Sequence, residues 1–239
     1  MSVTDYLSIS TGSVVAVVGC GGKTSLIELV ADRLRDKKVL ISTTTKIFPP
    51  KMKDIVLCET LGQCEGHEPR TGVQCMGLLN RESGKLEALP EALLARLRTR
   101  YDIVLLEADG SRGLNCKGWL ENEPVVPSYC THTVGIVTMN ALGKPAGETT
   151  VHRLPEFFAL TGVGEGQTIT LAALEAMVCD PNGMFKNSAG QRYVVVNQAE
   201  DAAASRAALT FLQGIKEKYP ARFEKLLYGS VHNDAWQGV

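Results

Sequence analysis

The sequence has no large excess of charge of either sign and no long apolar segment. Its 25 basic and 26 acidic side chains give a formal net charge of −1. This balance does not favour a nucleic-acid or anionic-membrane partner, whose electrostatics require a basic surface. No apolar run approaches the ~20 residues of a membrane span, and Met1–Asp5 lacks the basic start of a secretory signal. These features predict a cytoplasmic protein.

The sequence also lacks a paired-cysteine motif. Seven cysteines are scattered along the chain without a C-x-x-C pair, which argues against a zinc ribbon or a thioredoxin-like site. Cys58, Cys64, His67 and Cys75 lie close together, but their spacing is irregular, and free cysteine is commonly a small buried hydrophobe. We therefore favour a structural role for these residues over metal ligation.

Apolar runs rich in β-branched residues alternate with amphipathic segments along the 239 residues. The pattern predicts strands at residues 14–18, 39–46, 103–106, 133–137, 193–196 and 226–228, and helices at 24–37, 90–97, 151–160, 171–178 and 202–218. This alternation predicts an α/β fold, with one domain over residues 1–239 and a mostly parallel sheet covered by helices on both faces. Short apolar pieces and turn residues at about 51–90 predict a small β-rich insertion that contains a hairpin.

The most informative segment is the glycine-rich stretch that follows the first predicted strand. It reads Gly19, Cys20, Gly21, Gly22, Lys23, Thr24 and Ser25. This order brings backbone N–H groups, a helix N-terminus and a lysine ammonium around one small volume, which suits the phosphates of a nucleotide. The loop is shorter than the usual pattern, which has a glycine where Val17 stands here. The alternative is a glycine-rich turn that carries an incidental lysine.

Two residues of this loop have further candidate chemistry. Thr24 or Ser25 can offer a hydroxyl to a bound Mg²⁺. A thiolate at Cys20 would be favoured and reactive near a helix N-terminus. A small residue tolerated in a tight loop is the simpler interpretation of Cys20, and we favour it.

A second strong signal is the pair of carboxylates that follows the apolar run at 103–106. Glu107 and Asp109 stand on alternate positions before Gly110. In a parallel sheet this end lies beside the phosphate loop, at the edge where ligands bind. Glu107 is placed to hold Mg²⁺ or to polarise an attacking water, and Asp109 is a candidate to share that work. The alternative is that both carboxylates cap the strand or pair with Arg112.

A third group of residues ends a late strand, where Asn197 is followed by Gln198, Glu200 and Asp201. In P-loop GTPases an N-K-x-D loop at this place reads the guanine base: the Asn braces the loop and the acid accepts from the N–H groups of the base. Gln198 replaces the Lys here, and the acid in register is Glu200. The segment predicts a base-binding loop, with guanine ahead of adenine. The alternative is an ordinary strand end followed by a helix N-cap.

Several sequence blocks occur in a characteristic order: Gly19–Ser25, Thr43–Lys46, Glu107–Gly113, Lys117–Trp119, Glu123–Pro127, Val151–Arg153 and the segment at Asn197. On these blocks the sequence resembles the YqeC family over nearly its whole length, and the E-A-D-G-S-R-G block at 107–113 is the most specific. The phosphate loop alone is also similar to that of Mur ligases, but the later blocks are not. The chain departs from the family at Asn115–Cys116, where a Pro-Leu-like pair is more frequent, and at Gln198, where a Lys is usual.

The resemblance implies a P-loop NTPase-like fold and a role in maturing selenium-dependent molybdenum hydroxylases, a role that is assigned to the family by inference. Its implied partners are a nucleotide and such a hydroxylase or its cofactor precursor.

Phosphoryl transfer depends mostly on positioning and on neutralising charge. The sequence supplies Lys23 and the loop amides for the β- and γ-phosphates, Thr24 and Glu107 for Mg²⁺, and Asp109 for a nucleophile or a second metal contact. Three basic residues are candidates to hold an anionic second substrate or to offset transition-state charge: Arg112, Lys117 and Arg153. Solvated surface charge is the alternative for each of the three.

Two classes of function agree with these residues. The first is an enzyme that uses Mg²⁺ and ATP or GTP as a kinase, ligase or hydrolase. The second is a nucleotide-state switch or chaperone-like docking protein for a metalloenzyme, with no small-molecule substrate. A nucleotide-binding relic without turnover is a third option. We favour the enzyme.

Overall fold

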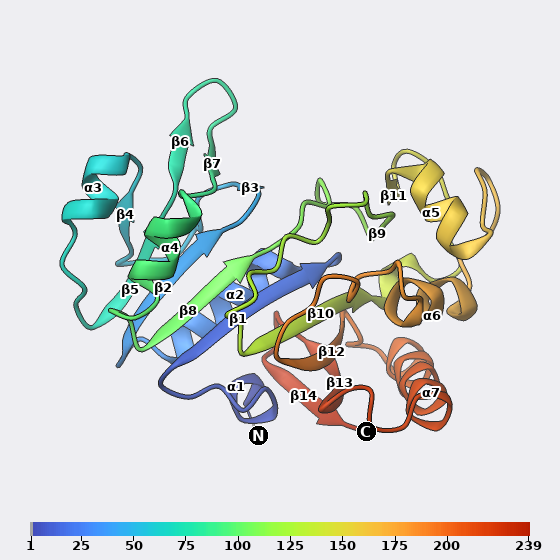
Figure 1. The fold of residues 1–239 in the computed structure, drawn as a ribbon. Coiled ribbons are helices and arrows are strands. Elements are labelled where there is room, and N and C mark those ends of the chain that lie inside the picture. The colour runs from blue at the N-terminus through green and yellow to red at the C-terminus, as the bar shows by residue number, and fades with distance from the viewer. Residues whose placement is uncertain (1) are drawn as a thin grey trace.

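In the computed structural model, which describes residues 2–239, the chain folds around a nine-stranded sheet (Figure 1). The strand order is β14-β13-β12-β10-β1-β8-β2-β5-β4, and all neighbouring pairs are parallel except β13 and β14. In the same order the strands span Ala235–Gly238, Lys225–Ser230, Gln191–Asn197, His132–Thr138, Ser13–Gly19, Ile103–Glu107, Lys38–Thr43, Gly72–Met76 and Val56–Cys58.

Helices cover both faces of this sheet, which is why its central strands read as continuous apolar runs. All seven residues of β1 are buried. Its alternate side chains enter two different cores: Val14, Ala16 and Val18 pack on one face, and Val15 and Val17 on the other. The first core includes α4 (Glu91–Leu97), α6 (Leu171–Cys179) and α7 (Ala202–Lys218). The second includes α1 (Val3–Tyr6) and α2 (Lys23–Arg33). The predicted α/β architecture, with a large mostly parallel sheet flanked by helices, is confirmed.

The sequence prediction was wrong at the start of one helix. Helix α5 spans Leu154–Thr161, whereas residues 151 and 152 form strand β11 (Val151–His152), which pairs in parallel with β9 (Cys116–Lys117). Arg153 has a φ of 61°, outside the helical region, and Pro155 stands in the first turn of α5. A proline fits the first turn of a helix because no N–H bond is needed there. The helix therefore starts after Arg153.

The region at 51–90 contributes to the main sheet as well as forming a hairpin. Strands β4 and β5 extend the sheet, with the short helix α3 (Leu61–Gly66) between them. The hairpin of β6 (Leu78–Asn80) and β7 (Lys85–Glu87) joins β3 (Lys46–Ile47) in a separate three-stranded sheet. In Figure 1 this hairpin projects beyond the main sheet. No helix within residues 2–239 has both the length and the apolar character that a membrane crossing requires.

We predict that Gly19→Ala destabilises the fold more than Gly12→Ala. Gly19 has a φ of 96° and Gly12 a φ of 93°, a backbone conformation that is strained for any residue with a side chain. A Cβ at Gly19 would lie 2.3 Å from the carbonyl oxygen of Ile136, whereas one at Gly12 would meet nothing within 4 Å. We expect a loss of about 1–2 kcal/mol at Gly12 from strain alone and about 1–3 kcal/mol more at Gly19 from the clash.

Urea unfolding of the two variants measures this difference. Equal losses would contradict a close contact between the end of β1 and β10.

Candidate functional site

The polar ends of neighbouring strands meet at one edge of the main sheet. Strand β1 lies between β8 and β10, and β12 lies beyond β10; their registers pair Val17 with Glu107 and Thr138 with Asn197. Because these strands are parallel, their carboxyl ends share one edge of the sheet. The loop at residues 19–25, called the phosphate loop below, therefore lies between Glu107 and Asn197.

The phosphate loop requires its glycines. Gly19, Gly21 and Gly22 all have positive φ angles. A Cβ at Gly21 would lie 2.4 Å from the side chain of Thr138, and one at Gly22 would lie 2.6 Å from Asn197 Nδ2. The loop is thus pressed against the ends of β10 and β12 at distances that side chains would prevent.

Asn197 braces the phosphate loop from β12. Its Nδ2 donates to the carbonyl oxygen of Gly21 at 2.8 Å, and its Oδ1 accepts from Val231 N at 2.9 Å. Both functions of the amide are therefore used within the protein. Asn197 therefore holds the loop in place from this position.

The start of α2 carries backbone donors without partners. Within residues 2–239, no protein oxygen accepts a hydrogen bond from the N–H groups of Gly21 to Ser25, and no side chain caps the helix. These N–H groups carry the partial positive charge of a helix N-terminus. Such an arrangement is a binding site for an anion.

Lys23 lies beneath the loop. Its Nζ donates to Gly19 O at 2.7 Å and to Ser111 Oγ at 3.0 Å, and it lies 3.3 Å from Asp109 Oδ1 and 3.8 Å from Glu107 Oε1. Burial disfavours the ammonium charge, but Asp109 and Glu107 outweigh this effect and raise the pKa of Lys23. Lys23 is therefore a fixed positive charge.

The side-chain oxygens of Thr24 and Glu107 lie side by side. Thr24 Oγ1 donates to Glu107 Oε2 at 2.7 Å. Burial raises the pKa of Glu107, partly offset by Lys23 and by the bond from Thr24. Within the described residues, no group of three or more His, Cys, Asp or Glu side chains could hold a metal ion. The chemistry of Thr24 and Glu107 fits Mg²⁺, which commonly binds through one or two protein oxygens together with waters and ligand phosphates.

Asp109 lies deeper than the sequence suggests. It is fully buried, and its Oδ2 accepts from Gly19 N at 3.0 Å and from Trp119 Nε1 at 2.8 Å. Burial disfavours its charge, but Lys23 and Lys117 outweigh this effect and hold the pKa of Asp109 below its ordinary value. The carboxylate thus supports the loop from below, and its predicted contact with a nucleophile or a metal stays a prediction.

Lys117 also departs from its predicted role. Its side chain is fully buried, and its Nζ lies 2.7 Å from Gly110 O and 3.3 Å from both Asp109 Oδ2 and Glu123 Oε2. Gly110 O and Glu123 Oε2 accept hydrogen bonds from the ammonium group, and Asp109 supplies a second counter-charge. Lys117 is therefore a structural charge beneath the site and is not placed to hold a substrate anion.

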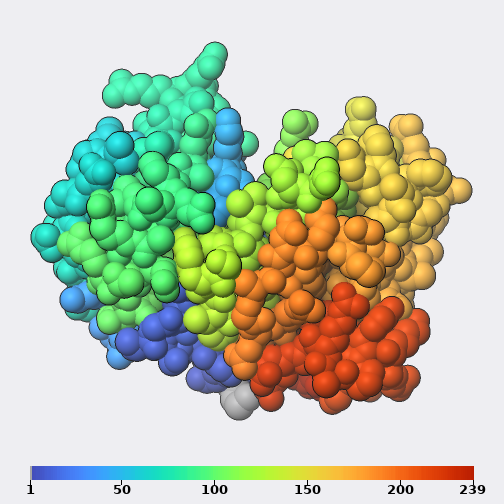
Figure 2. Space-filling view, viewed as in Figure 1, coloured from blue at the N-terminus to red at the C-terminus, as the bar shows by residue number. Residues whose placement is uncertain are grey.

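Two cavities meet at the phosphate loop, and Gly22 and Ser25 line both. The larger, about 970 Å³, lies between the small sheet and the segments at 110–113 and 152–153. We call it the basic cavity, because five cations line it against two carboxylates: Lys23, Lys46, Lys85, Arg112 and Arg153 against Glu107 and Glu123. Figure 2 shows the surface hollowed between the teal hairpin and the green segment near residue 120.

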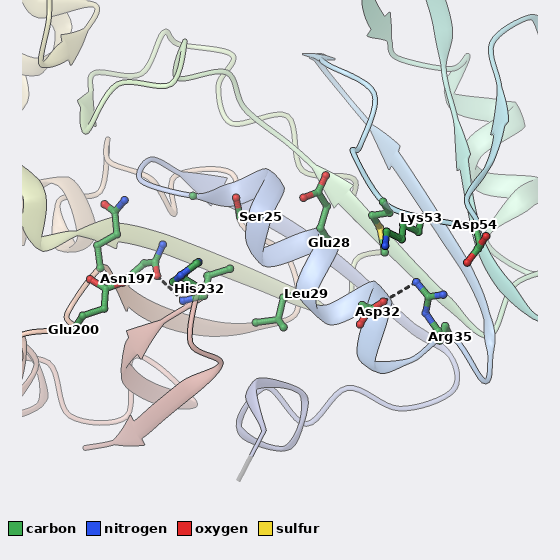
Figure 3. Close-up of a pocket in the computed structure, with 14 residues that line it drawn as sticks. Ser25, Glu28, Leu29, Asp32, Arg35, Lys53, Asp54, Asn197, Glu200 and His232 are labelled. Atoms are coloured by element: carbon green, nitrogen blue, oxygen red, sulfur yellow. Dashed lines mark hydrogen bonds and ion pairs between the residues drawn. The ribbon is translucent and has the colours of Figure 1, made fainter.

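The second cavity, about 830 Å³, runs along α2 and has the opposite charge. We call it the acidic cavity, because four carboxylates line it against two cations: Glu28, Asp32, Asp54 and Glu200 against Arg35 and Lys53. Figure 3 shows Asn197, Glu200 and His232 grouped at one end, beyond Ser25, and Lys53 and Asp54 at the other.

The structure separates the two acids that were predicted to bind a base. Glu200 lines the acidic cavity, and its Oε1 accepts from Ser230 Oγ at 2.6 Å. The carboxylate of Asp201 instead accepts from Ala203 N and Ala204 N, both at 2.8 Å, as the N-cap of α7. The helix N-terminus uses this carboxylate, as in the alternative that the sequence left open, and base contact by Asp201 stays a prediction.

Sequence reasoning missed several residues of the basic cavity, and Glu123 and His152 are two of them. Glu123 pairs with Arg153 and lies beside Lys117, and these cations outweigh burial and lower its pKa. His152 has its pKa lowered to about 4 by burial and by Arg153, Lys117 and Arg112, so the imidazole is neutral at pH 7. The signal for both was present, since each stands in one of the sequence blocks noted above.

The cysteines show no sign of chemistry. Cys20 is fully buried, its Sγ donates to Asn115 O at 3.1 Å, and burial raises its pKa to about 12. Cys58, Cys64 and Cys75 are buried thiols whose pKa burial also raises. These residues are small packing groups.

The YqeC family, described as YqeC protein, matches residues 15–155. The "Uncharacterized protein YqeC" of Escherichia coli (strain K12) is 34% identical over 212 residues, which cover 84% of this chain and 83% of that relative.

We predict that Asp109→Asn destabilises the protein by about 3–5 kcal/mol, because two buried ammonium groups lose their shared counter-charge. The matched control is Glu175→Gln, which breaks the pair of Glu175 with the exposed Lys218 at 2.9 Å and should cost less than about 1 kcal/mol. Urea unfolding at neutral pH measures both.

The pH dependence supplies a further check on the same variant. A lowered pKa in the folded state means that the Asp109 charge stabilises the fold above the ordinary value of 3.8 and is lost as pH falls through the lower folded value. The difference between wild type and Asp109→Asn should be constant from pH 5 to 8 and shrink below pH 4. A small, pH-independent difference would contradict the buried network.

Proposed function

The chain belongs to the YqeC family, and we propose that it binds the Mg²⁺ complex of a nucleoside triphosphate at the phosphate loop and hydrolyses it or transfers its terminal phosphoryl group. One observation carries this proposal: the unpartnered N–H groups of Gly21 to Ser25, Lys23 and the Thr24–Glu107 oxygen pair surround one point at which two cavities meet.

The β- and γ-phosphates would accept from the N–H groups of the loop. Lys23 would supply a permanent positive charge from below, because Asp109 keeps it protonated and in place. Thr24 and Glu107 would hold the Mg²⁺, which neutralises phosphate charge and orients the terminal group. Arg112 reaches the same cavity and would offset charge that develops in the transition state.

The base would lie at the end of the acidic cavity that holds Glu200. A carboxylate accepts from N–H groups, and guanine presents two such groups on one edge, which favours GTP over ATP. Gln198 also lines this cavity, and its side-chain oxygen accepts a hydrogen bond from Thr138 Oγ1. The fixed negative charge also keeps further phosphate away from this end.

We extend the proposal to a biological role on the strength of the sequence resemblance. The reaction would serve the maturation of selenium-dependent molybdenum hydroxylases, with the hydroxylase or its cofactor precursor as partner. The nucleotide chemistry stands on the site itself and is tested separately.

We predict that Lys23→Ala weakens binding of the Mg²⁺ nucleotide by about 2–4 kcal/mol, as for truncation of a buried charge contact. Isothermal calorimetry with Mg-ATP and Mg-GTP on wild type and variant measures this loss and ranks the two bases. The control is Lys218→Ala, which removes an exposed ammonium that lines neither cavity. Undetectable binding of both nucleotides to the wild type would overturn the proposal.

We predict that Glu107→Gln removes the dependence of nucleotide binding on Mg²⁺. In the wild type, chelation of Mg²⁺ should weaken binding at least about tenfold, and in the variant it should have little effect. The variant should stay folded: burial raises the pKa of Glu107, so its charge destabilises the fold above the ordinary value of 4.5. Glu107→Gln should therefore stabilise the fold at pH 7, with the gain lost below pH 4.5.

Calorimetry with and without a chelator, and urea unfolding across pH, measure the two effects. Unchanged Mg²⁺ dependence in Glu107→Gln would contradict the assignment of this carboxylate.

A further inference from the structure

The basic cavity holds more positive charge than a nucleotide triphosphate needs at the phosphate loop. Lys23 serves the loop from below, and the Thr24–Glu107 pair accounts for the metal. The remaining cations come from three separate parts of the chain: Lys46 and Lys85 from the small sheet, Arg112 from the loop after β8, and Arg153 from the start of α5.

Two of these four cations lack a carboxylate partner. Lys46 lies 2.8 Å from Glu87, and Arg153 pairs with Glu123. Among residues 2–239, no carboxylate lies within 4.0 Å of the side-chain nitrogens of Arg112 or Lys85, and Lys85 Nζ lies 4.9 Å from the ring centre of Phe48. Arg112 and Lys85 therefore present uncompensated charge to the basic cavity from different elements.

Two of the arginines that line the basic cavity have an unusual backbone conformation. Arg112 has a φ of 52° and Arg153 a φ of 61°, both in the left-handed region that residues other than glycine rarely adopt. Such conformations cost about 1–3 kcal/mol each and cluster at ligand sites. Both arginines line the basic cavity.

His152 is neutral because it is buried beside the cations of the basic cavity. Burial, Arg153, Lys117 and Arg112 lower its pKa to about 4, so a ring that lines this cavity does not add to its charge. A neutral imidazole offers a nitrogen acceptor to a hydroxyl group beside the cations.

We propose that the basic cavity binds an anionic second substrate, whose phosphate or carboxylate group is held by Arg112 and Lys85 beside the terminal phosphate of the nucleotide. This inference rests on the proposed function, since it places the second substrate across from the phosphate loop. The exposed ring of Phe48, 59% accessible at the cavity wall, provides apolar surface for the body of the molecule. Arg112 is suited to a planar oxyanion, because its guanidinium can donate two parallel hydrogen bonds.

The test uses inorganic phosphate and malonate as separate probes. Each is titrated by calorimetry into protein saturated with Mg²⁺ and a non-hydrolysable triphosphate, so that the phosphate loop is already filled. We expect one or both anions to bind. Arg112→Gln and Lys85→Gln should each weaken that binding about tenfold, the effect of one lost hydrogen bond to a charged group. Lys85→Gln should change the affinity for the triphosphate much less, because Lys85 has no role at the phosphate loop.

Two controls keep the result specific. Arg206→Gln makes the same chemical change on the exposed side of α7, away from both cavities, and should leave anion binding unchanged. Arg112→Lys keeps the charge and should retain most of the binding. Stronger binding of phosphate points to a phosphorylated substrate, and stronger binding of malonate points to a carboxylate.

Failure of this inference can be told from failure of the proposed function. Triphosphate binding without anion binding, or anion binding that neither Arg112→Gln nor Lys85→Gln weakens, would overturn the second site alone. If the triphosphate does not bind, the anions are titrated into nucleotide-free wild type and Lys23→Ala. Binding that depends on Arg112 and not on Lys23 would then support the second site, and binding that depends on Lys23 alone would overturn it.

Discussion

The site depends on one buried carboxylate placed between two buried ammonium groups. Asp109 lies 3.3 Å from the nitrogens of both Lys23 and Lys117, and the chain of alternating charges continues through Glu123 to Arg153. A buried charge is stable only when it is paired, so each member fixes the next. The same carboxylate accepts from Gly19 N and holds the start of the phosphate loop. Asp109 therefore stabilises both the conformation of the phosphate loop and the positions of the charged side chains beneath it.

Two cavities of opposite charge lie on either side of the phosphate loop. The acidic cavity suits the uncharged, donor-bearing parts of a nucleotide, and the basic cavity suits phosphate and other anions. A ligand that carries both kinds of group has only one favourable orientation across Gly22 and Ser25, which line both cavities. Electrostatics of this kind fixes register and specificity more than it adds affinity. In the proposed complex, this difference in charge would orient the nucleotide before its base makes contact.

The sequence predicted where the glycine-rich loop and Glu107 lie. It did not predict how deeply Asp109 and Lys117 are buried, because that depends on packing between distant parts of the chain. The glycine pattern at 19–25 and the carboxylate at Glu107 could be located because their roles depend on strand ends, which hydrophobic runs mark clearly. The roles of Asp109 and Lys117 could not be read, because an apolar run indicates that a strand is buried but not how deep its polar end lies. Asp201 illustrates a local competition: the N-terminus of α7 takes the carboxylate that the base was expected to use. The parallel strand β11 was missed because two residues carry no periodicity.

A structure of the protein with Mg²⁺ and a non-hydrolysable guanosine triphosphate analogue tests the central claim most directly. The account predicts β- and γ-phosphate oxygens within hydrogen-bond distance of the N–H groups of Gly21 to Ser25. It places the metal on Thr24 and Glu107, the base beside Glu200, and the terminal phosphate facing Arg112. Phosphates bound elsewhere on the chain, or a loop left empty at saturating nucleotide, would contradict it.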